Sequence, residues 1–322
     1  MPDLTVDING VKFNNLVFVA SGSYGHGKEL FKVSPPQNFG AVTIKSLLPR
    51  PNPGNPAPRL HPMTDGMLNA IGLPGMGVDN WFSEYYNFIE KKYTANSASL
   101  VFAIWGKAVE DFIEATKDFV ENVKPRKNAL KIIKAFEINV SCPNTSDPSK
   151  LFSYDPDAVS QIVESCRKIL NQLDEKILIF TKLSPNQTSV IPSAVAAVNA
   201  GSDALIISNT MPGKVTKNNK SVLGNEFGGL SGPQIKPIVL KHVDAVIKHF
   251  KSEKQEVNVI ACGGILNAND VLDYMRLGCK AVEIATGIFL KPRIVDNIIS
   301  DLNKMCLKHK VGNISELIEK EI

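Results

Sequence analysis

The stretch Ile177–Ser208, ILIFTKLSPNQTSVIPSAVAAVNAGSDALIIS, decides the fold because it contains one complete strand–helix–strand unit. Its first apolar run, Ile177–Leu183, is followed by a helical pattern over Ser189–Ala200. Gly201 then stands where a helix C-cap belongs, and a second apolar run, Ala204–Ser208, ends the unit. Continuous aliphatic and β-branched runs of this length are typical of parallel strands that are buried on both faces.

The same unit recurs along the chain. Eight apolar runs are expected to be strands: Val17–Ser21, Ala41–Lys45, Leu100–Trp105, Ala135–Ser141, Ile177–Leu183, Ala204–Ser208, Val257–Ala261 and Ala281–Thr286. Helical patterns separate most of them: Val109–Val123, Pro156–Leu173, Ser189–Ala200, Pro233–Phe250 and Asn267–Leu277. Asp155 and Asn267 occupy N-cap positions, and Gly278 occupies a C-cap position. Eight units predict an α/β fold, a (β/α)8 TIM barrel. A doubly wound open sheet is the alternative, but it usually has fewer strands and a glycine fingerprint after the first strand.

Two further features accompany the expected barrel. Asp3–Phe13 alternates apolar and polar residues around Asn9-Gly10, which predicts an N-terminal β-hairpin. Two long βα-loop insertions, Ser46 to Asp79 and Met211 to Leu230, interrupt the rhythm. Such loops carry the active site in barrels of this kind. With no internal repeat, residues 1–322 are expected to form a single barrel domain.

Composition excludes several classes of function. Lys and Arg number 36 and Asp and Glu number 32, so the net charge is only +4, which gives no reason to expect a nucleic-acid partner. No apolar stretch approaches a membrane-spanning length. The cysteine count is odd and no C-x-x-C pair is present, which argues against a disulfide framework or a metal site and favours a reducing, cytoplasmic location. The cysteines are Cys142, Cys166, Cys262, Cys279 and Cys306.

Polar or glycine residues follow most of the expected strands. They are Lys45-Ser46, Asn139, Ser141-Cys142-Pro143-Asn144, Lys182, Asn209-Thr210, Gly263-Gly264 and Ala285-Thr286. Each has an ordinary explanation by itself, since a lysine can extend to solvent and an asparagine or glycine can form a turn. Because the carboxyl ends of barrel strands face one shared pocket, the set together indicates a site for a planar, anionic ligand.

Two groups of these strand-end residues indicate a more specific function. Gly263-Gly264 together with Ala285-Thr286 matches a barrel phosphate site, in which backbone N–H groups hold the anion. Cys142 follows a strand and opens a polar loop, and an exposed thiol near lysines can act as a base or a nucleophile. Of the five histidines only His26 lies near another tip, so proton abstraction is favoured over thiol-protease chemistry.

Seven motifs, taken in order, resemble the soluble (class 1) dihydroorotate dehydrogenases. They are Val19-Ala-Ser-Gly22, Thr43-Ile-Lys-Ser46, Gly66-Met-Leu-Asn-Ala-Ile-Gly-Leu73, Asn139-Val-Ser-Cys-Pro-Asn144, Lys182-Leu-Ser-Pro185, Gly228-Gly-Leu-Ser-Gly-Pro233 and Ala261-Cys-Gly-Gly264. The resemblance runs from the first barrel strand to about Leu290. It departs from the family at Ala285, where many relatives have glycine, and over Leu73–Asp79.

The resemblance implies FMN across the barrel mouth and oxidation of dihydroorotate to orotate in pyrimidine biosynthesis. Cys142 would remove the C5 proton while a hydride passes from C6 to flavin N5. The implied cofactor-binding residues are Ala20, Ser21, Gly22, Lys45, Ser46, Asn139, Lys182, Ser208, Gly232, Gly263, Gly264, Ala285 and Thr286. The implied substrate-binding residues are Lys45, Asn69, Gly72, Leu73, Asn139, Asn144, Asn209 and Thr210.

The resemblance leaves the electron acceptor open. One soluble branch is a homodimer that reduces fumarate, and the other works with an FAD and iron–sulfur subunit that reduces NAD+. Gly66–Leu73, Asn209–Gly213 and Gly229–Pro237 look more like the NAD-linked branch. Leu73-Pro74 and Leu151–Asp155 look more like the fumarate branch. A homodimer is expected.

Three rival functions fit the sequence less well. A tRNA dihydrouridine synthase carries a basic helical domain after its barrel, whereas this chain ends soon after Ile298–Lys308. A reductase of dihydropyrimidine catabolism has its cysteine further along the loop, and Asn144–Asp155 contains none. A non-catalytic flavin-binding module would leave Cys142 without a role.

Overall fold

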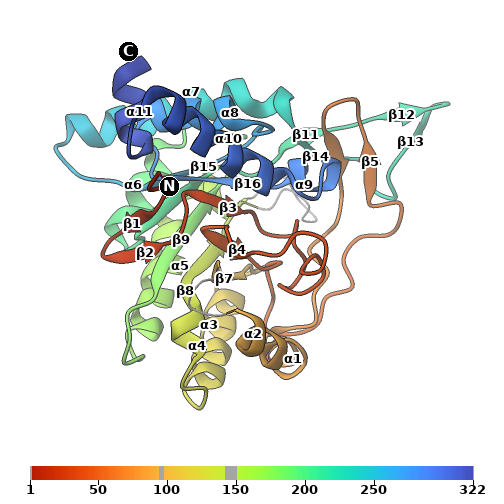
Figure 1. The fold of residues 1–322 in the computed structure, drawn as a ribbon. Coiled ribbons are helices and arrows are strands. Elements are labelled where there is room, and N and C mark those ends of the chain that lie inside the picture. The colour runs from red at the N-terminus through yellow and green to blue at the C-terminus, as the bar shows by residue number, and fades with distance from the viewer. Residues whose placement is uncertain (1, 94–97, 142–150, 322) are drawn as a thin grey trace.

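The eight expected runs form a closed parallel barrel. The computed structural model describes residues 2–93, 98–141 and 151–321. The barrel strands are β3 (Val17–Val19), β4 (Ala41–Thr43), β7 (Ser99–Ile104), β8 (Ile133–Asn139), β9 (Leu178–Leu183), β10 (Ala204–Ile207), β15 (Val259–Cys262) and β16 (Ala281–Ile284). Each pairs with the next in the chain, and β16 pairs with β3 to close the ring (Figure 1). The (β/α)8 barrel is therefore confirmed, and the open-sheet alternative is wrong.

The barrel interior has an apolar layer below a polar layer. Inward-facing residues alternate along each strand, as the two-residue period of a strand requires. The lower layer forms one buried apolar cluster that includes Phe18, Val101, Phe180, Ile206 and Ile260. Nearer the carboxyl ends the inward positions become polar, although the side chains there are still buried: Thr43, Glu137, Asn139, Lys182 and Glu283.

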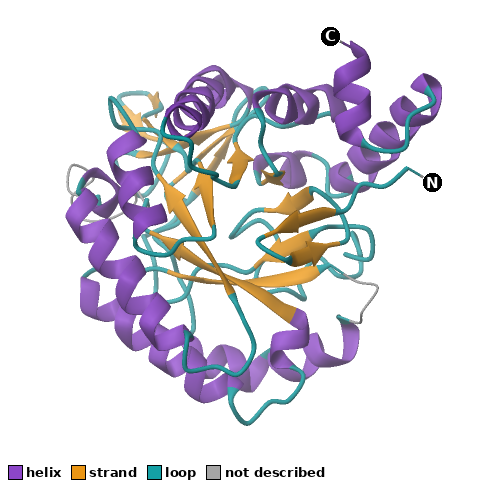
Figure 2. Ribbon diagram, turned by 90° about the vertical axis from the view of Figure 1, so that its left-hand side faces the viewer, coloured by secondary structure: helices purple, strands orange, loops and turns teal. Residues whose placement is uncertain are grey.

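Helices surround the strands on the outside, as Figure 2 shows. The long ones are α3 (Val109–Val123), α5 (Pro156–Leu170), α6 (Ile191–Asn199), α7 (Lys236–Ser252), α8 (Ala268–Leu277) and α10 (Ile294–His309). Asp155 caps α5 by accepting hydrogen bonds from the N–H groups of Asp157 and Ala158. Asn267 caps α8, and Gly278 ends it with φ +105°. Among the described helices, none combines the length and the apolar character needed to cross a membrane.

Several short helices have no counterpart among the sequence expectations. They are α1 (Val78–Glu84), α2 (Tyr86–Lys92), α4 (Ala129–Ile132), α9 (Thr286–Leu290), α11 (Ile314–Glu321) and the 3-10 turns η1 (Phe152–Tyr154) and η2 (Pro233–Ile235). The pair α1–α2 is broken at Tyr85, so neither half is long enough to show a helical period. The helix expected from Pro233 begins instead at Lys236, after η2.

The expected N-terminal hairpin lies at the amino ends of the barrel strands. Its strands are β1 (Val6–Ile8) and β2 (Val11–Phe13), joined by Asn9 and Gly10 at φ +48° and +85°. The Phe13 ring is fully buried, with its centroid 4.9 Å from that of Phe18. The Asn9 amide donates to the carboxylate of Asp203 over 2.9 Å. The hairpin therefore closes the base of the apolar layer.

The two long insertions meet in a single antiparallel sheet above the barrel. This rim sheet consists of β5 (Leu60–Pro62), β6 (Met67–Asn69), β11 (Met211–Gly213) and β14 (Gly228–Ser231). Its order is β11-β14-β6-β5, so segments about 160 residues apart lie side by side. A small hairpin of β12 (Thr216–Lys217) and β13 (Lys220–Ser221) projects beyond it (Figure 1).

Candidate functional site

A cavity of about 1220 Å³, counting its open mouth, lies between the carboxyl ends of the barrel strands and the rim sheet. Its floor comes from strand ends, and one wall comes from β6 and the segment that follows it. Small ligands and cofactors bind at the carboxyl end of a barrel. The cavity is therefore the candidate site.

Most of the site residues expected from the sequence line this one cavity. They are Ala20, Ser21, Gly22, Lys45, Asn69, Gly72, Leu73, Asn139, Lys182, Ser208, Asn209, Thr210, Gly232, Gly263, Gly264, Ala285 and Thr286. Ser46 does not line it, because it is buried behind Ser21, with 3.1 Å between their hydroxyl oxygens. Cys142 and Asn144 lie outside the described residues.

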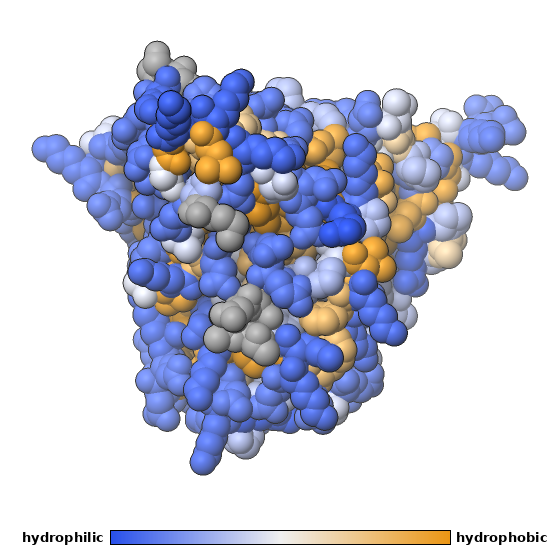
Figure 3. Space-filling view, viewed as in Figure 1, coloured by the Kyte–Doolittle hydropathy of each residue, from blue (hydrophilic) through white to orange (hydrophobic). Residues whose placement is uncertain are grey.

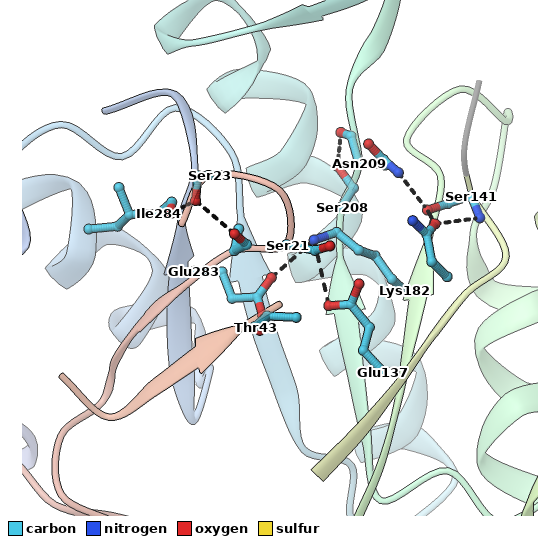
Figure 4. Close-up of polar contacts among 12 residues, drawn as sticks. Ser21, Ser23, Thr43, Glu137, Ser141, Lys182, Ser208, Asn209, Glu283 and Ile284 are labelled. Carbon is cyan, nitrogen blue, oxygen red and sulfur yellow. Dashed lines mark hydrogen bonds and ion pairs between the residues drawn. The ribbon is translucent and has the colours of Figure 1, made fainter. Parts of the chain in front are cut away.

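A buried charge cluster forms the cavity floor. The Lys182 ammonium lies 3.1 Å from one carboxylate oxygen of Glu283 and 3.9 Å from one of Glu137 (Figure 4). The Thr43 hydroxyl donates to the other Glu283 oxygen over 3.1 Å. Lys182 and Glu283 line the cavity, whereas Glu137 is completely enclosed below it.

Burial and mutual attraction shift the pKa values of this cluster in opposite directions. Burial, together with the negative charge of Glu283, raises the pKa of Glu137 to about 8, although Lys182 acts to lower it. Burial by itself would lower the pKa of Lys182, but the two glutamates together outweigh it and raise that pKa. Lys182 therefore stays charged at neutral pH.

A chain of hydrogen bonds connects the ends of four strands around the cavity. The side-chain amide of Asn209 donates to the Ser141 hydroxyl over 3.0 Å. That hydroxyl donates to the side-chain oxygen Oδ1 of Asn139, also over 3.0 Å (Figure 4). The Asn139 amide then donates to Ser46, 3.3 Å away, which in turn contacts Ser21. Each amide is thus held in one orientation, which prepares the site for a ligand of fixed shape.

His26 lies close to the Lys45 end of the site. Its ring packs against Tyr85 with centroids 5.2 Å apart. Burial lowers the pKa of His26 to about 4, with opposition from Glu29 and further lowering by Lys45 and Lys28. The imidazole is therefore neutral at neutral pH and supplies no positive charge to the cavity.

The glycine tips form a cradle of exposed backbone at the opposite end. Gly264 has φ +69°, and a Cβ there would lie 2.5 Å from Cβ of Lys236. Gly232 has φ +115°, and a Cβ there would lie 2.6 Å from Cα of Gly66. No side chain fits at either position. The Thr286 hydroxyl donates to the Ser231 hydroxyl over 2.7 Å, so β14 and the end of β16 meet at this cradle.

The rim-sheet side of the cavity is fixed by asparagine side chains. The Asn69 amide donates to the Gly229 carbonyl oxygen over 3.0 Å and so ties β6 to β14. The Asn52 amide donates to the carbonyl oxygens of Gly72 and Leu73 at 2.9 Å and 2.8 Å. Sequence reasoning singled out Gly72 and Leu73 but missed Asn52, which holds them.

Two further residues of the floor, Glu137 and Glu283, were also missed. The signal was present in the sequence, since each is a lone acidic residue inside an otherwise apolar run. Glu137 lies two residues before Asn139, so it shares the inward face of β8.

Comparison with known proteins identifies the family. The family model for dihydroorotate dehydrogenase matches residues 3–306. The chain belongs to the dihydroorotate dehydrogenase family. A protein of Geotalea daltonii named dihydroorotate dehydrogenase B (NAD(+)), catalytic subunit, is 36% identical over 98% of this chain and 97% of its own length. The protein of the same name from Pelobacter propionicus is 34% identical over 98% of both chains.

A solved structure supports the fold. A crystal structure of DHODH in complex with ferulenol from Eimeria tenella matches with a TM-score of 0.78, covering 99% of this chain and 88% of that chain. At 23% identity this likeness concerns the fold alone.

Dihydroorotate dehydrogenases of this family are FMN-dependent oxidoreductases, so the expected enzyme class and cofactor are confirmed. The described residues fit FMN. The cradle at Gly232 and Gly264 exposes backbone where a side chain cannot stand, which suits a phosphate group. The charged Lys182 on the floor suits the edge of a flavin ring that gains negative charge on reduction.

Proposed function

We propose that this cavity binds FMN and dihydroorotate together and that the chain catalyses the oxidation of dihydroorotate to orotate. The observation that carries the proposal is the convergence of Lys45, Asn139 and Lys182 with the glycine cradle in one cavity. No residue at a single strand end points to this ligand. Together, however, the positive charges, an oriented amide and a cradle for an anion match a flavin nucleotide. We also propose that residues 1–322 act as one FMN-binding barrel domain, because hairpin and rim sheet both pack on the barrel.

The proposed cofactor residues divide by the part of FMN they would hold. Backbone at Gly232, Gly263, Gly264, Ala285 and Thr286 would donate N–H groups to the phosphate. The isoalloxazine ring would lie over Ala20, Ser21 and Gly22 and over the side chains of Lys45, Asn139 and Lys182, with Ser46 and Ser208 supporting this end. FMN, when bound, supplies the acceptor for the hydride.

The proposed substrate residues surround the remaining volume. Lys45 and the amides of Asn69, Asn139, Asn144 and Asn209, with the Thr210 hydroxyl, would bind the pyrimidine ring and its carboxylate. Gly72 and Leu73 would add backbone N–H groups. The hydrogen bonds of Asn139 and Asn209 to Ser141 support this role, because they fix which amide atoms point into the cavity. Positioning of this kind is the protein's main contribution to a hydride transfer.

Cys142 is the proposed catalytic base and would take the proton from C5 of the substrate. Ser141, the residue before it, is buried and hydrogen-bonded to Asn139 and Asn209. Further along the chain, the Ser153 N–H donates to the Val140 carbonyl oxygen over 3.0 Å. The described residues on either side of positions 142–150 are thus hydrogen-bonded to each other, and Ser141 is also bonded to two residues that line the cavity, which supports the assignment.

We further propose that the chain passes its electrons to NAD+ through a partner subunit and works in the cytoplasm. The relatives named catalytic subunits match at 36% and 34% identity over nearly the full chain, which supports this branch over the fumarate branch. Exposed apolar side chains at the cavity mouth, Leu60 and Phe289, also suit a protein that receives a partner near the flavin. In the view of Figure 3, apolar side chains gather on the side of the molecule where the rim sheet lies. The expected homodimer stays a prediction.

Anaerobic reduction tests both parts of the proposal. Purified protein should bind FMN, and dihydroorotate should bleach the flavin absorbance without oxygen. NAD+ and fumarate are then added separately to the reduced protein. Reoxidation by neither points to a missing partner subunit, whereas rapid reoxidation by fumarate would overturn the NAD branch. Failure of dihydroorotate to bleach bound FMN would overturn the substrate.

A further inference from the structure

The interior of the barrel holds more negative charge than the reaction requires. Among the residues of the eight barrel strands, only Lys134, Glu137, Lys182 and Glu283 carry charged side chains. Lys134 is half-buried and donates to the Leu130 carbonyl oxygen, away from the cluster. Two carboxylates therefore share one ammonium inside the barrel, and Glu137 has no place in the proposed contacts with substrate or cofactor.

The two glutamates are not equivalent. Glu283 has Lys182 and the Thr43 hydroxyl at 3.1 Å each, so both of its oxygens have a hydrogen-bond partner. Glu137 is 0% exposed, and neither of its oxygens has a hydrogen-bond partner among the described residues. Its nearest opposite charge, Lys182, lies 3.9 Å away. An ionised carboxylate in that condition is costly, because it has lost its hydration without gaining hydrogen bonds.

No other charged side chain on the barrel strands compensates Glu137. Lys45 follows β4 and lines the cavity, but the charges that shift the pKa of Glu137 are those of Lys182 and Glu283. Lys182 comes from β9, Glu283 from β16, and β15 adds the thiol of Cys262, whose pKa burial raises to about 12. Strand β4 adds only the neutral Thr43, and β3, β7 and β10 carry no charged side chain. With both glutamates ionised the cluster carries −1, and one added proton makes it neutral.

We propose that Glu137, Lys182 and Glu283 share one proton that resides on Glu137, and that Glu137 adjusts the charge beneath the flavin when the flavin is reduced. This inference rests on the proposed position of FMN above Lys182. Glu137 touches neither substrate nor cofactor. It acts through Lys182, as a positioning residue that sets the net charge of the cluster.

The proton uptake that accompanies flavin reduction would depend on whether Glu137 is protonated beforehand. A hydride from dihydroorotate would carry two electrons and one proton equivalent to bound FMN, which would add one negative charge above Lys182. Where Glu137 is protonated beforehand, the charges of Lys182 and Glu283 compensate each other. Reduction would then add only the hydrogen of the hydride, and no further proton from water. Where Glu137 is ionised beforehand, the new charge draws a second proton from water onto its carboxylate. Reduction then takes up two hydrogen nuclei for two electrons.

Infrared spectroscopy tests the shared proton without using the reaction. Oxidised protein at pH near neutrality should show the carbonyl stretch of a protonated, weakly hydrogen-bonded carboxyl group, and Glu137→Gln should abolish it. Asp244→Asn, which changes a carboxylate on the outer face of α7, is the matched control and should leave the band unchanged. A band that persists in Glu137→Gln would overturn the assignment.

The Thr43→Val variant tells which glutamate holds the proton. Thr43 donates to Glu283 and to neither oxygen of Glu137. Its removal should therefore leave the frequency of the band in place if the proton is on Glu137. An upward shift would place the proton on Glu283 and overturn the proposal in its present form.

The midpoint potential of bound FMN, measured against pH, tests the coupling. In the wild type, the midpoint potential should fall more steeply with pH as the pH rises, because proton uptake changes from one to two protons per two electrons. In Glu137→Gln the slope should stay at the value for one proton over the whole pH range. Protonation of the flavin itself would change the slope in the opposite direction. A break that persists in Glu137→Gln would overturn the coupling. Identical potentials despite loss of the infrared band would overturn the coupling together with the position of FMN. Failure to bind FMN would overturn the proposed function and the coupling, and the infrared band would then decide the shared proton by itself.

Discussion

At the scale of single residues, Cys142 carries the sharpest prediction. A serine hydroxyl is a much weaker acid than a thiol, so the Cys142→Ser variant has little base available near neutral pH. Flavin reduction by dihydroorotate should slow by about 10²–10⁴-fold. FMN content, read from the visible absorbance, should not change, because the proposed cofactor contacts come from other residues. Near-normal reduction by stopped flow would remove Cys142 from the mechanism.

Glu137 predicts a pH dependence of stability. Folding raises its pKa from 4.5 to about 8, so the folded protein binds more protons than the unfolded chain between those values. The stability that this proton supports is fully present below pH 4.5 and is lost as the pH rises through about 8. Urea denaturation should show the wild type losing stability relative to Glu137→Gln across this range. Parallel curves for the two proteins would contradict the assignment.

At the scale of elements, the strand tips set the cofactor site. In Gly264→Ala the new Cβ would meet Lys236 at 2.5 Å in a backbone with φ +69°. We expect a loss of about 1–3 kcal/mol in the free energy of unfolding and a weaker affinity for FMN, measured by fluorescence. Gly312→Ala is the control, because its Cβ would meet only Glu316 at 3.5 Å, an ordinary contact. Equal FMN affinity in the two variants would exclude the cradle as the phosphate site.

The rim segment gives a second test at this scale. Asn52→Ala removes two hydrogen bonds to the carbonyl groups of Gly72 and Leu73. The KM for dihydroorotate should rise by up to about 30-fold, since two hydrogen bonds of this kind contribute about 2 kcal/mol together, while FMN binding stays intact. Asn80→Ala, which removes a similar bond to Met76 outside the cavity, should leave KM unchanged. A rise in both variants would indicate a general effect on α1 and its surroundings.

At the scale of the whole molecule, we expect the isolated chain to be unable to reduce NAD+. Its five cysteines include no C-x-x-C pair that could begin an iron–sulfur site, and no second nucleotide fingerprint follows a strand. Anaerobic mixing of the reduced protein with NAD+ should give no NADH absorbance, while an artificial dye should be reduced. Direct NADH formation by the chain alone would show that it contains a further cofactor.

The barrel could be predicted from the sequence because its signals are local. Each strand is a short apolar run, and caps such as Asp155, Asn267 and Gly278 mark helix ends within a few residues. The rim sheet could not be predicted, because β6 pairs with β14 across about 160 residues and neither segment has a strand pattern by itself. Most cavity residues could be predicted because they follow the ends of strands. The role of Asn52, and the difference in hydrogen bonding between Glu137 and Glu283, could not be predicted because they depend on contacts between distant segments.

The closed base of the barrel has a consequence for how the chain folds during synthesis. Asn9 bonds to Asp203 and accepts from Asn258, and the Asp3 N–H donates to the Gly312 carbonyl oxygen over 2.6 Å. This hairpin segment is therefore made well before its partners, which follow about 190 to 310 residues later in the sequence. Contacts of such high sequence separation slow folding, because the chain must close a very long loop before they form. Ile8 and Phe13 are fully buried in the folded chain, so their apolar side chains stay exposed until those later segments have been made, and such transient exposure favours aggregation.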